Sequence, residues 1–337
     1  MKILKGRGFA VRGFAVRRVA VRGSLWLACL ALVGLALAAT RAAPLAQQIF
    51  RTGSDAVRVF VTVTDRDGRL VTTLGRDNFE IRDDGKPQPL TQFDNSAQPI
   101  RLIVLLDVSG SMEGNLPLLR SATVELFKRL LPEDVARLGT FGHEVTISPA
   151  FTRNSEELLA ALPAAIMPNA LTPLWRALTD AIEAFGEGNE TRKVILVLSD
   201  GKDTGPIDFR KRPASQGDVI DRARLEDVMI YAVGLRSRPR PGPPGIGPGG
   251  LQAMLSDNLP DPGLAKVAEE TGGGFTEIRF GQDLGAAFAG VADELHTQYL
   301  LAFAPPKRDG KVHKIEVKVD TAGLKPRGRR SYVAPKG

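Results

Sequence analysis

Five side chains of this chain carry oxygen atoms to positions where they could bind a metal ion. They are Asp107, Ser109, Ser111, Thr172 and Asp200. The first three follow the apolar run 102–106 and lie two residues apart, the fourth begins a predicted helix, and the fifth follows a second apolar run, 193–199. Carboxylate and hydroxyl oxygens are hard ligands, which suit Mg²⁺, with Mn²⁺ or Ca²⁺ as alternatives.

Each of these residues also has a local interpretation. Asp107, Ser109 and Gly110 could form only a turn, and Asp200 with Gly201 another. Thr172 could be a helix N-cap, with Pro173 at the favoured first helical position. A shared metal site therefore requires a fold that brings the ends of the two apolar runs together.

The segment that begins at Arg101 alternates between apolar runs and amphipathic stretches. Strands are predicted over 101–107, 135–141, 145–149, 193–199, 228–235 and 275–280, and helices over 116–131, 154–162, 172–185, 218–226, 264–271 and 282–295. Repeated strand–helix units predict an α/β fold: a doubly wound, mostly parallel, Rossmann-like sheet. Functional groups of such sheets gather at the carboxyl ends of the strands, where Asp107 and Asp200 would meet.

Both flanks of this segment have β character. Strands are predicted over 57–64, 79–82, 89–93, 299–303, 312–320 and 330–333, with a hairpin turn at 83–86 between the second and third of them. Neither flank has enough strands for a core of its own. We therefore predict that 50–98 and 296–337 pair into one small β-sandwich, into which the α/β domain, 99–295, is inserted.

The N-terminus has the layout of a secretory signal. Residues 1–38 contain seven Lys and Arg and no acidic residue, and the apolar run 25–39 contains the Ala36-Leu37-Ala38 cleavage pattern. We predict a signal peptide and short polar lead over 1–46, and hence a secreted, periplasmic or cell-envelope protein. The alternative is an uncleaved anchor, which would be the chain's one contact with a membrane.

The composition excludes two classes of function. The 337-residue chain has a formal net charge of +7, and without the seven N-terminal cations it falls to zero, so nucleic acid is not an expected partner. The single cysteine, Cys29, lies in the apolar run that precedes the cleavage site, so the mature protein has neither a disulfide nor thiol chemistry.

The five oxygen-bearing residues resemble the metal-ion-dependent adhesion site of the von Willebrand factor A family. The family pattern is Asp-x-Ser-x-Ser after the first strand, a Thr that opens a later helix, and an Asp after a central strand. The β flanks are similar to those of the VWFA-related proteins of Acidobacteria, from Val61-Thr62-Val63-Thr64-Asp65 to His313-Lys314-Ile315-Glu316-Val317. The resemblance implies that Ser109, Ser111 and Thr172 bind the cation through hydroxyls, and that Asp107 and Asp200 bind it directly or through water.

The expected function is Mg²⁺-dependent adhesion rather than catalysis. The two carboxylates only neutralise the charge of the ion, and the neutral hydroxyl ligands leave it electrophilic. An open coordination position could therefore accept an Asp or Glu carboxylate of a protein partner. The alternatives are an envelope protein with a purely structural metal, and a metal-dependent hydrolase. The hydrolase would need a general base, and the histidines do not offer one. His143, His296 and His313 lie in separate elements, and the last is predicted to face outward. The Pro- and Gly-rich loop 236–250 should emerge at the metal-site edge. Oligomeric state is open.

Overall fold

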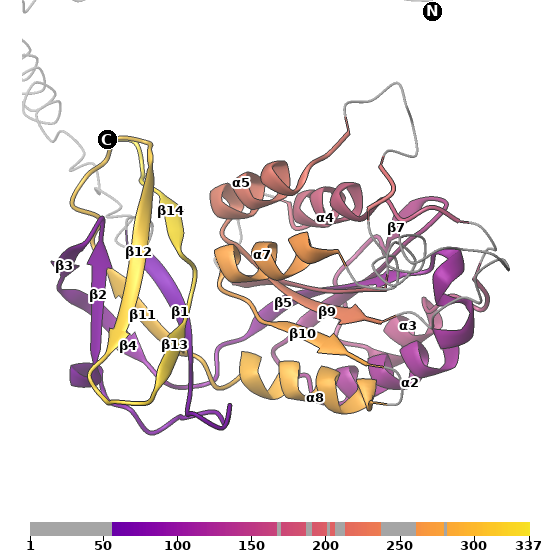
Figure 1. Cartoon of the computed structure of the whole chain (residues 1–337), viewed down its shortest axis with the longest axis horizontal. Coiled ribbons are helices and arrows are strands. Elements are labelled where there is room, and N and C mark those ends of the chain that lie inside the picture. The colour runs from indigo at the N-terminus through magenta and orange to yellow at the C-terminus, as the bar shows by residue number, and fades with distance from the viewer. Residues whose placement is uncertain are drawn as a thin grey trace, which may run out of the picture. The chain divides into compact units, whose positions relative to one another are not determined.

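A six-stranded sheet lies at the centre of the inserted domain (Figure 1). The computed structural model describes residues 56–166, 170–186, 191–200, 203–205, 213–236, 261–279 and 282–337, without the side chains of Ser111 and Glu113. The predicted leader, 1–46, and loop residues 237–250 lie outside these ranges. The strands are β5 (Ile100–Asp107), β6 (Val135–Phe141), β7 (Val145–Ile147), β8 (Arg192–Ser199), β9 (Val228–Leu235) and β10 (Phe275–Ile278).

The order across the sheet is β10-β9-β8-β5-β6-β7. All neighbours are parallel except β6 and β7, which pair antiparallel. Successive residues of β5 point to opposite faces, and Leu102 through Leu106 are fully buried because helices cover both faces. The predicted doubly wound, mostly parallel sheet is therefore confirmed.

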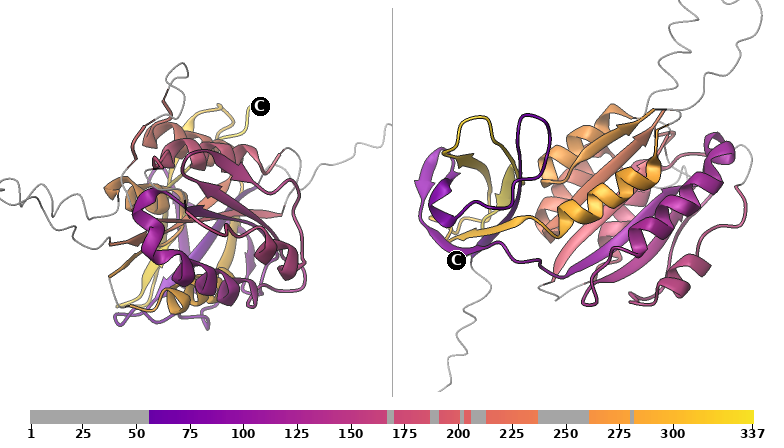
Figure 2. Two further views of the ribbon diagram at one scale, coloured as in Figure 1. Left: turned by 90° about the vertical axis from the view of Figure 1, so that its right-hand side faces the viewer. Right: turned by 90° about the horizontal axis from the view of Figure 1, so that it is seen from below.

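Two groups of helices cover the sheet, one on each face (Figures 1 and 2). On one face lie α2 (Leu116–Phe127), α3 (Ser155–Ala160) and α8 (Leu284–Leu295), which share a core with Leu102, Val104 and Leu106. On the other lie α4 (Leu174–Glu183), α5 (Gln216–Glu226) and α7 (Pro262–Thr271), which share a core with Ile103 and Leu105. Among the helices that the structure describes, none is long and apolar enough to cross a membrane.

The flanking strands form two four-stranded sheets around one core. The strands are β1 (Val57–Thr64), β2 (Phe79–Asp83), β3 (Lys86–Gln88), β4 (Leu90–Asp94), β11 (Tyr299–Phe303), β12 (Val312–Val319), β13 (Lys325–Arg327) and β14 (Ser331–Val333). The sheets have the orders β13-β1-β11-β4 and β14-β12-β2-β3. Strand β1 pairs with β11, and β2 with β12, both antiparallel. The predicted sandwich, built from N- and C-terminal strands around an inserted domain, is confirmed.

The predicted hairpin needs a correction. The partner of β2 is β3, with Ile81 opposite Gln88, and β4 pairs with β11 in the other sheet. The reason is the turn, in which Asp84 and Gly85 have φ of 45° and 81°. Two consecutive residues with positive φ close a hairpin in two residues, so the return strand begins at Lys86 rather than Pro89.

His313 was predicted to face outward, and this was wrong. Its side chain is 3% exposed, and it shares a face of β12 with Ile315, which is also buried in the sandwich. The cause is the two-residue period of a strand, which puts residues 313, 315 and 317 on one face and Lys314 and Glu316 on the other.

Candidate metal centre

Asp107 and Asp200 lie at the carboxyl ends of two neighbouring strands. Strands β5 and β8 are parallel, and their register pairs Leu106 with Leu198. Asp107 is the last residue of β5, and Asp200 directly follows Ser199, the last residue of β8. Both carboxylates are fully buried. The fold thus brings these two predicted site residues to one edge of the sheet.

The Asp107 carboxylate is held by a hydrogen bond at each oxygen. The backbone N–H of Ser109 donates to Oδ1 at 2.8 Å, and the hydroxyl of Ser199 donates to Oδ2 at 2.5 Å. Burial, followed by the negative charge of Asp200, raises the pKa of Asp107 to about 7, although the Ser109 and Ser199 hydrogen bonds act in the opposite direction. Two buried acids that repel each other make this a place where a divalent cation would be stabilised.

Ser109 and Ser111 lie where the chain leaves β5. Ser109 is 1% exposed and immediately precedes a short 3₁₀-helix, η2 (Gly110–Asn115). The side chain of Ser111 lies outside the described part of the structure. The N–H of Gly110 donates to the carbonyl of Ala170 at 3.4 Å, which holds this turn against the segment leading to Thr172.

Thr172 is buried just before α4, and its backbone is fixed by Thr204. The Thr172 N–H donates to Thr204 Oγ1 at 2.8 Å, and the Thr204 N–H donates to the Thr172 carbonyl at 3.0 Å. The local interpretation of Thr172 as N-cap was wrong, because Pro173 has that position and α4 begins at Leu174. The role of Thr172 as a metal ligand stays a prediction.

Sequence reasoning missed three residues that support the site: Ser199, Asp203 and Thr204. Asp203 Oδ1 accepts from the backbone N–H of Trp175 at 3.3 Å in the first turn of α4. Burial raises the pKa of Asp203. The only sequence signal for these residues was their closeness to Asp200, which did not indicate that they would contact the start of a helix some 30 residues earlier.

The histidines lie in other surroundings. His143 is exposed, and His296, the C-cap residue of α8, has its Nε2 2.8 Å from Asp134 Oδ2. His313 belongs to the sandwich, beside Asp83 and Asp84. The described part of the candidate metal centre therefore has only oxygen ligands to offer, from Asp107, Ser109, Thr172 and Asp200.

The chain was compared with known families, curated proteins and solved structures, and the family match agrees with this fold. Residues 102–253 match the family model described as the von Willebrand factor type A domain, a range that includes all five candidate ligands. A von Willebrand factor type A structure from Catenulispora acidiphila is 12% identical, covering 85% of this chain and 76% of that chain with a TM-score of 0.45. An aerotolerance-related membrane protein from Bacteroides fragilis is 14% identical, covering 58% and 98%, with a TM-score of 0.41. No curated protein matches the chain.

Proposed function

We propose that the von Willebrand factor type A domain of this chain binds a protein partner through a divalent cation, Mg²⁺ in the first instance. Domains of this family commonly mediate protein–protein interactions, and residues 102–253 match the family model. The proposed ligands are Asp107, Ser109, Ser111, Thr172 and Asp200. The observation that carries the proposal is the pair of fully buried carboxylates, Asp107 and Asp200, at adjoining strand ends.

The donor set fits a hard cation. Mg²⁺ prefers oxygen ligands and retains several waters, so two carboxylates and neutral hydroxyls suffice to hold it. Burial and, second, repulsion from Asp200 raise the pKa of Asp107, and a bound ion would replace that repulsion by attraction. Bound there, the ion would offer an open coordination position to an Asp or Glu carboxylate of the partner.

The chain's own residues would orient the site before a partner arrives. Ser199 and the Ser109 N–H hold the two oxygens of Asp107, and Thr204 fixes the backbone of Thr172. Supporting groups of this kind keep ligands in a productive orientation and contribute to metal affinity. We further propose that residues 1–46 direct the protein to the cell envelope or the exterior, where such a partner would be exposed.

The decisive experiment is affinity capture from an envelope extract with the full chain, in Mg²⁺ and in EDTA. We expect a partner that is retained in Mg²⁺, is released by EDTA, and is not captured by Asp107→Ala. Asp221→Ala, which changes an exposed carboxylate of α5, is the matched control and should capture normally. Capture that is insensitive to both EDTA and Asp107→Ala would refute the proposal.

A thermal melt of the same samples separates adhesion from a purely structural metal. If Mg²⁺ raises the melting temperature of the wild type but no metal-dependent partner appears, the ion would only hold the loops together, and the adhesion proposal would be replaced by a structural one.

A further inference from the structure

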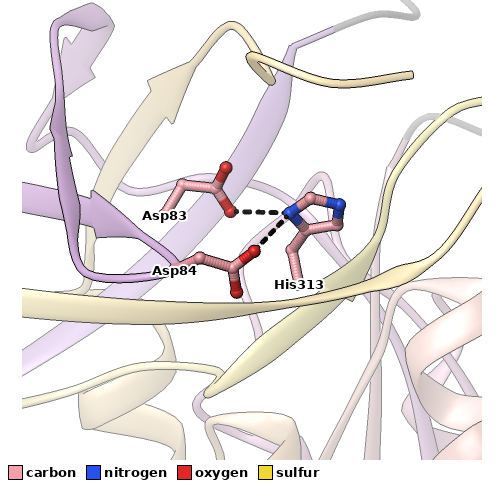
Figure 3. A group of neighbouring side chains, drawn as sticks. All are labelled: Asp83, Asp84 and His313. Carbon is pink, nitrogen blue, oxygen red and sulfur yellow. Dashed lines mark ion pairs between the residues drawn. The ribbon is translucent and has the colours of Figure 1, made fainter. Parts of the chain in front are cut away.

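We propose a second metal site, in the β-sandwich, where Asp83, Asp84 and His313 bind a divalent transition metal such as Zn²⁺. Figure 3 shows the two carboxylates pointing toward the same ring nitrogen of His313. One oxygen of each carboxylate and one nitrogen of the imidazole lie within 4.8 Å of one another. The site is separate from the one at Asp107, and its existence does not depend on the adhesion proposal.

The fold brings these residues together from opposite ends of the sequence. Asp83 ends β2 and lies opposite Ile315 of β12, which puts His313 diagonally across the strand pair. Asp84 begins the hairpin turn and is bound to β12 twice. Its N–H donates to the Lys314 carbonyl at 3.0 Å, and its Oδ1 accepts from the Lys314 N–H at 3.0 Å. Its other oxygen, Oδ2, is left to face His313.

Two buried polar atoms of the cluster make ion-pair contacts but no hydrogen bond of good geometry in the described structure. They are Oδ1 of Asp83 and Nδ1 of His313, each on a side chain that is 3% exposed. Buried polar atoms almost always have a partner, and leaving them unsatisfied is costly. The two atoms lie 3.3 Å apart, so a single cation beside them would satisfy both.

The spacing of the three atoms fits a metal. His313 Nδ1 lies 3.0 Å from Asp84 Oδ2 and 3.3 Å from Asp83 Oδ1. For ligands about 2.1 Å from an ion, neighbouring ligand atoms are about 3.0 Å apart in an octahedron and about 3.4 Å apart in a tetrahedron. The two separations from His313 Nδ1 lie within this range, and the two carboxylate oxygens lie within 4.8 Å of each other, so a metal could be reached by all three atoms.

The other nitrogen of His313 supports the assignment. Nε2 lies 3.1 Å from Oδ1 of Asp309, the arrangement in which a ligating histidine donates its second N–H to a carboxylate. With the hydrogen on Nε2, the lone pair of Nδ1 points at two carboxylates and needs a positive charge between them. That charge is either a metal ion or a proton on Nδ1, and the experiment must distinguish these two.

One imidazole and two carboxylates favour a borderline cation. Imidazole suits Zn²⁺ and its neighbours among the transition metals, whereas Mg²⁺ prefers oxygen alone. The metal would cross-link the β2–β3 turn of the N-terminal flank to β12 of the C-terminal flank. The whole inserted domain separates these two segments in the sequence. Cross-links that close long loops can stabilise the folded state by restricting the unfolded chain. We therefore expect Zn²⁺ to raise the melting temperature.

The test is Zn²⁺ titration of the metal-free full chain by calorimetry, in the Asp107→Ala background to remove the first site. We expect about one equivalent of Zn²⁺ in that background and at least a tenfold loss of affinity on adding Asp84→Asn. Asparagine suits the φ of 45° at Asp84, and its carbonyl can still accept from the Lys314 N–H, so the fold should survive. Asp227→Asn is the matched control, because Asp227 is the other described non-glycine residue with positive φ and lies at the end of α5.

A second variant and a spectrum keep the test decisive. Asp309→Asn should weaken binding by about tenfold, because it replaces the negative charge that faces the second N–H of His313 by a neutral and weaker acceptor. Co²⁺ in place of Zn²⁺ should give visible absorption bands that Asp84→Asn reduces and Asp227→Asn retains. If the Asp107→Ala chain binds no Zn²⁺, or if Asp84→Asn binds it as tightly, the cluster is a protonated histidine held by carboxylates and the proposal is wrong.

Discussion

Thr62 donates a hydrogen bond of 2.7 Å to Oε1 of Glu294, which lies 232 residues later in the sequence. Thr62 is in β1 of the sandwich and Glu294 is near the end of α8 in the inserted domain. Glu294 Oε1 also accepts from Tyr231 and Arg327, and Gln298 Nε2 donates to Thr62 Oγ1 at 2.6 Å. This shared polar network explains why Thr62 is only 2% exposed, although its neighbours in the alternation of β1, Phe60 and Thr64, are more exposed.

We predict that Glu294→Ala will be markedly destabilising. The substitution leaves the Arg327 guanidinium and the Tyr231 hydroxyl without their shared acceptor. A buried donor without an acceptor lowers the stability of the folded state. The Glu294 carboxylate is 16% exposed and Arg327 is 36% exposed, so solvent reduces the effect, and we expect a loss of about 2–3 kcal/mol in the free energy of unfolding. Urea denaturation measures it.

Glu125→Ala provides the comparison for this variant. Glu125 of α2 also pairs with a cation, Lys128 at the C-cap, at 3.0 Å, but both side chains are exposed. Exposed pairs contribute about 0–1 kcal/mol, so this variant should unfold near the wild-type urea concentration. Equal losses in the two variants would mean that the network around Glu294 does not stabilise the fold.

Ser199 should contribute to cation affinity although it is not a proposed ligand. Its hydroxyl donates to Oδ2 of Asp107 at 2.5 Å, which orients the carboxylate and lowers its pKa. In Ser199→Ala we expect Mg²⁺ affinity, measured by calorimetry, to fall by about tenfold. Ser121→Ala, which removes an exposed hydroxyl of α2, should bind Mg²⁺ normally. Unchanged affinity in Ser199→Ala would show that this hydrogen bond does not support the site.

Asp94 should make the sandwich sensitive to acid. Its Oδ1 accepts from the hydroxyl of Ser96 at 2.7 Å and from the Ser96 N–H at 2.8 Å, and these bonds lower the pKa of Asp94. Because the folded-state pKa is below the unfolded one, the stabilisation is complete above the ordinary Asp pKa of about 3.9 and is lost as pH falls through the folded value. Asp94→Asn should therefore have a lower unfolding free energy than wild type at neutral pH, and this difference should become smaller in acid.

Ser96→Ala is the control for this pH dependence. It removes the hydroxyl donor but retains the backbone donor to Asp94, so its unfolding free energy should show an intermediate dependence on pH. A difference between Asp94→Asn and wild type that stays constant down to acid pH would contradict the assignment.

Local patterns in the sequence were sufficient to predict the sheet and part of the site. The run Leu102–Leu106 is apolar on both faces because it packs against two separate cores, and such runs indicate buried parallel strands. Once β5 and β8 are parallel neighbours, Asp107 and Asp200 must reach the same edge of the sheet. The meeting of Asp107 and Asp200 was therefore predictable from the parallel direction of the two strands and their order in the sheet.

What could not be predicted depends on contacts between distant segments. The exchange of hydrogen bonds between Thr172 and Thr204 joins two loops whose conformations no local pattern specifies. The Asp83–His313 contact depends on the register between β2 and β12, which a one-residue shift would abolish. Similarly, β4 leaves its hairpin for the other sheet because the turn at Asp84 and Gly85 closes early.

Gly273 should be the least replaceable of the glycines that follow α7, and a glycine of α8 provides a matched comparison. A Cβ built on Gly273 would lie 2.0 Å from the carbonyl oxygen of Ile230 in β9, whereas one built on Gly290 meets nothing within 4 Å. Gly273→Ala must therefore push the backbone away from β9, and we expect a loss of about 3 kcal/mol or more in unfolding free energy. Gly290→Ala should instead gain about 0.5–1 kcal/mol, because alanine is the better helix former. Thermal and urea unfolding of the two variants would measure the expected loss and the expected gain in unfolding free energy. A Gly273→Ala protein as stable as wild type would contradict the close approach of this turn to β9.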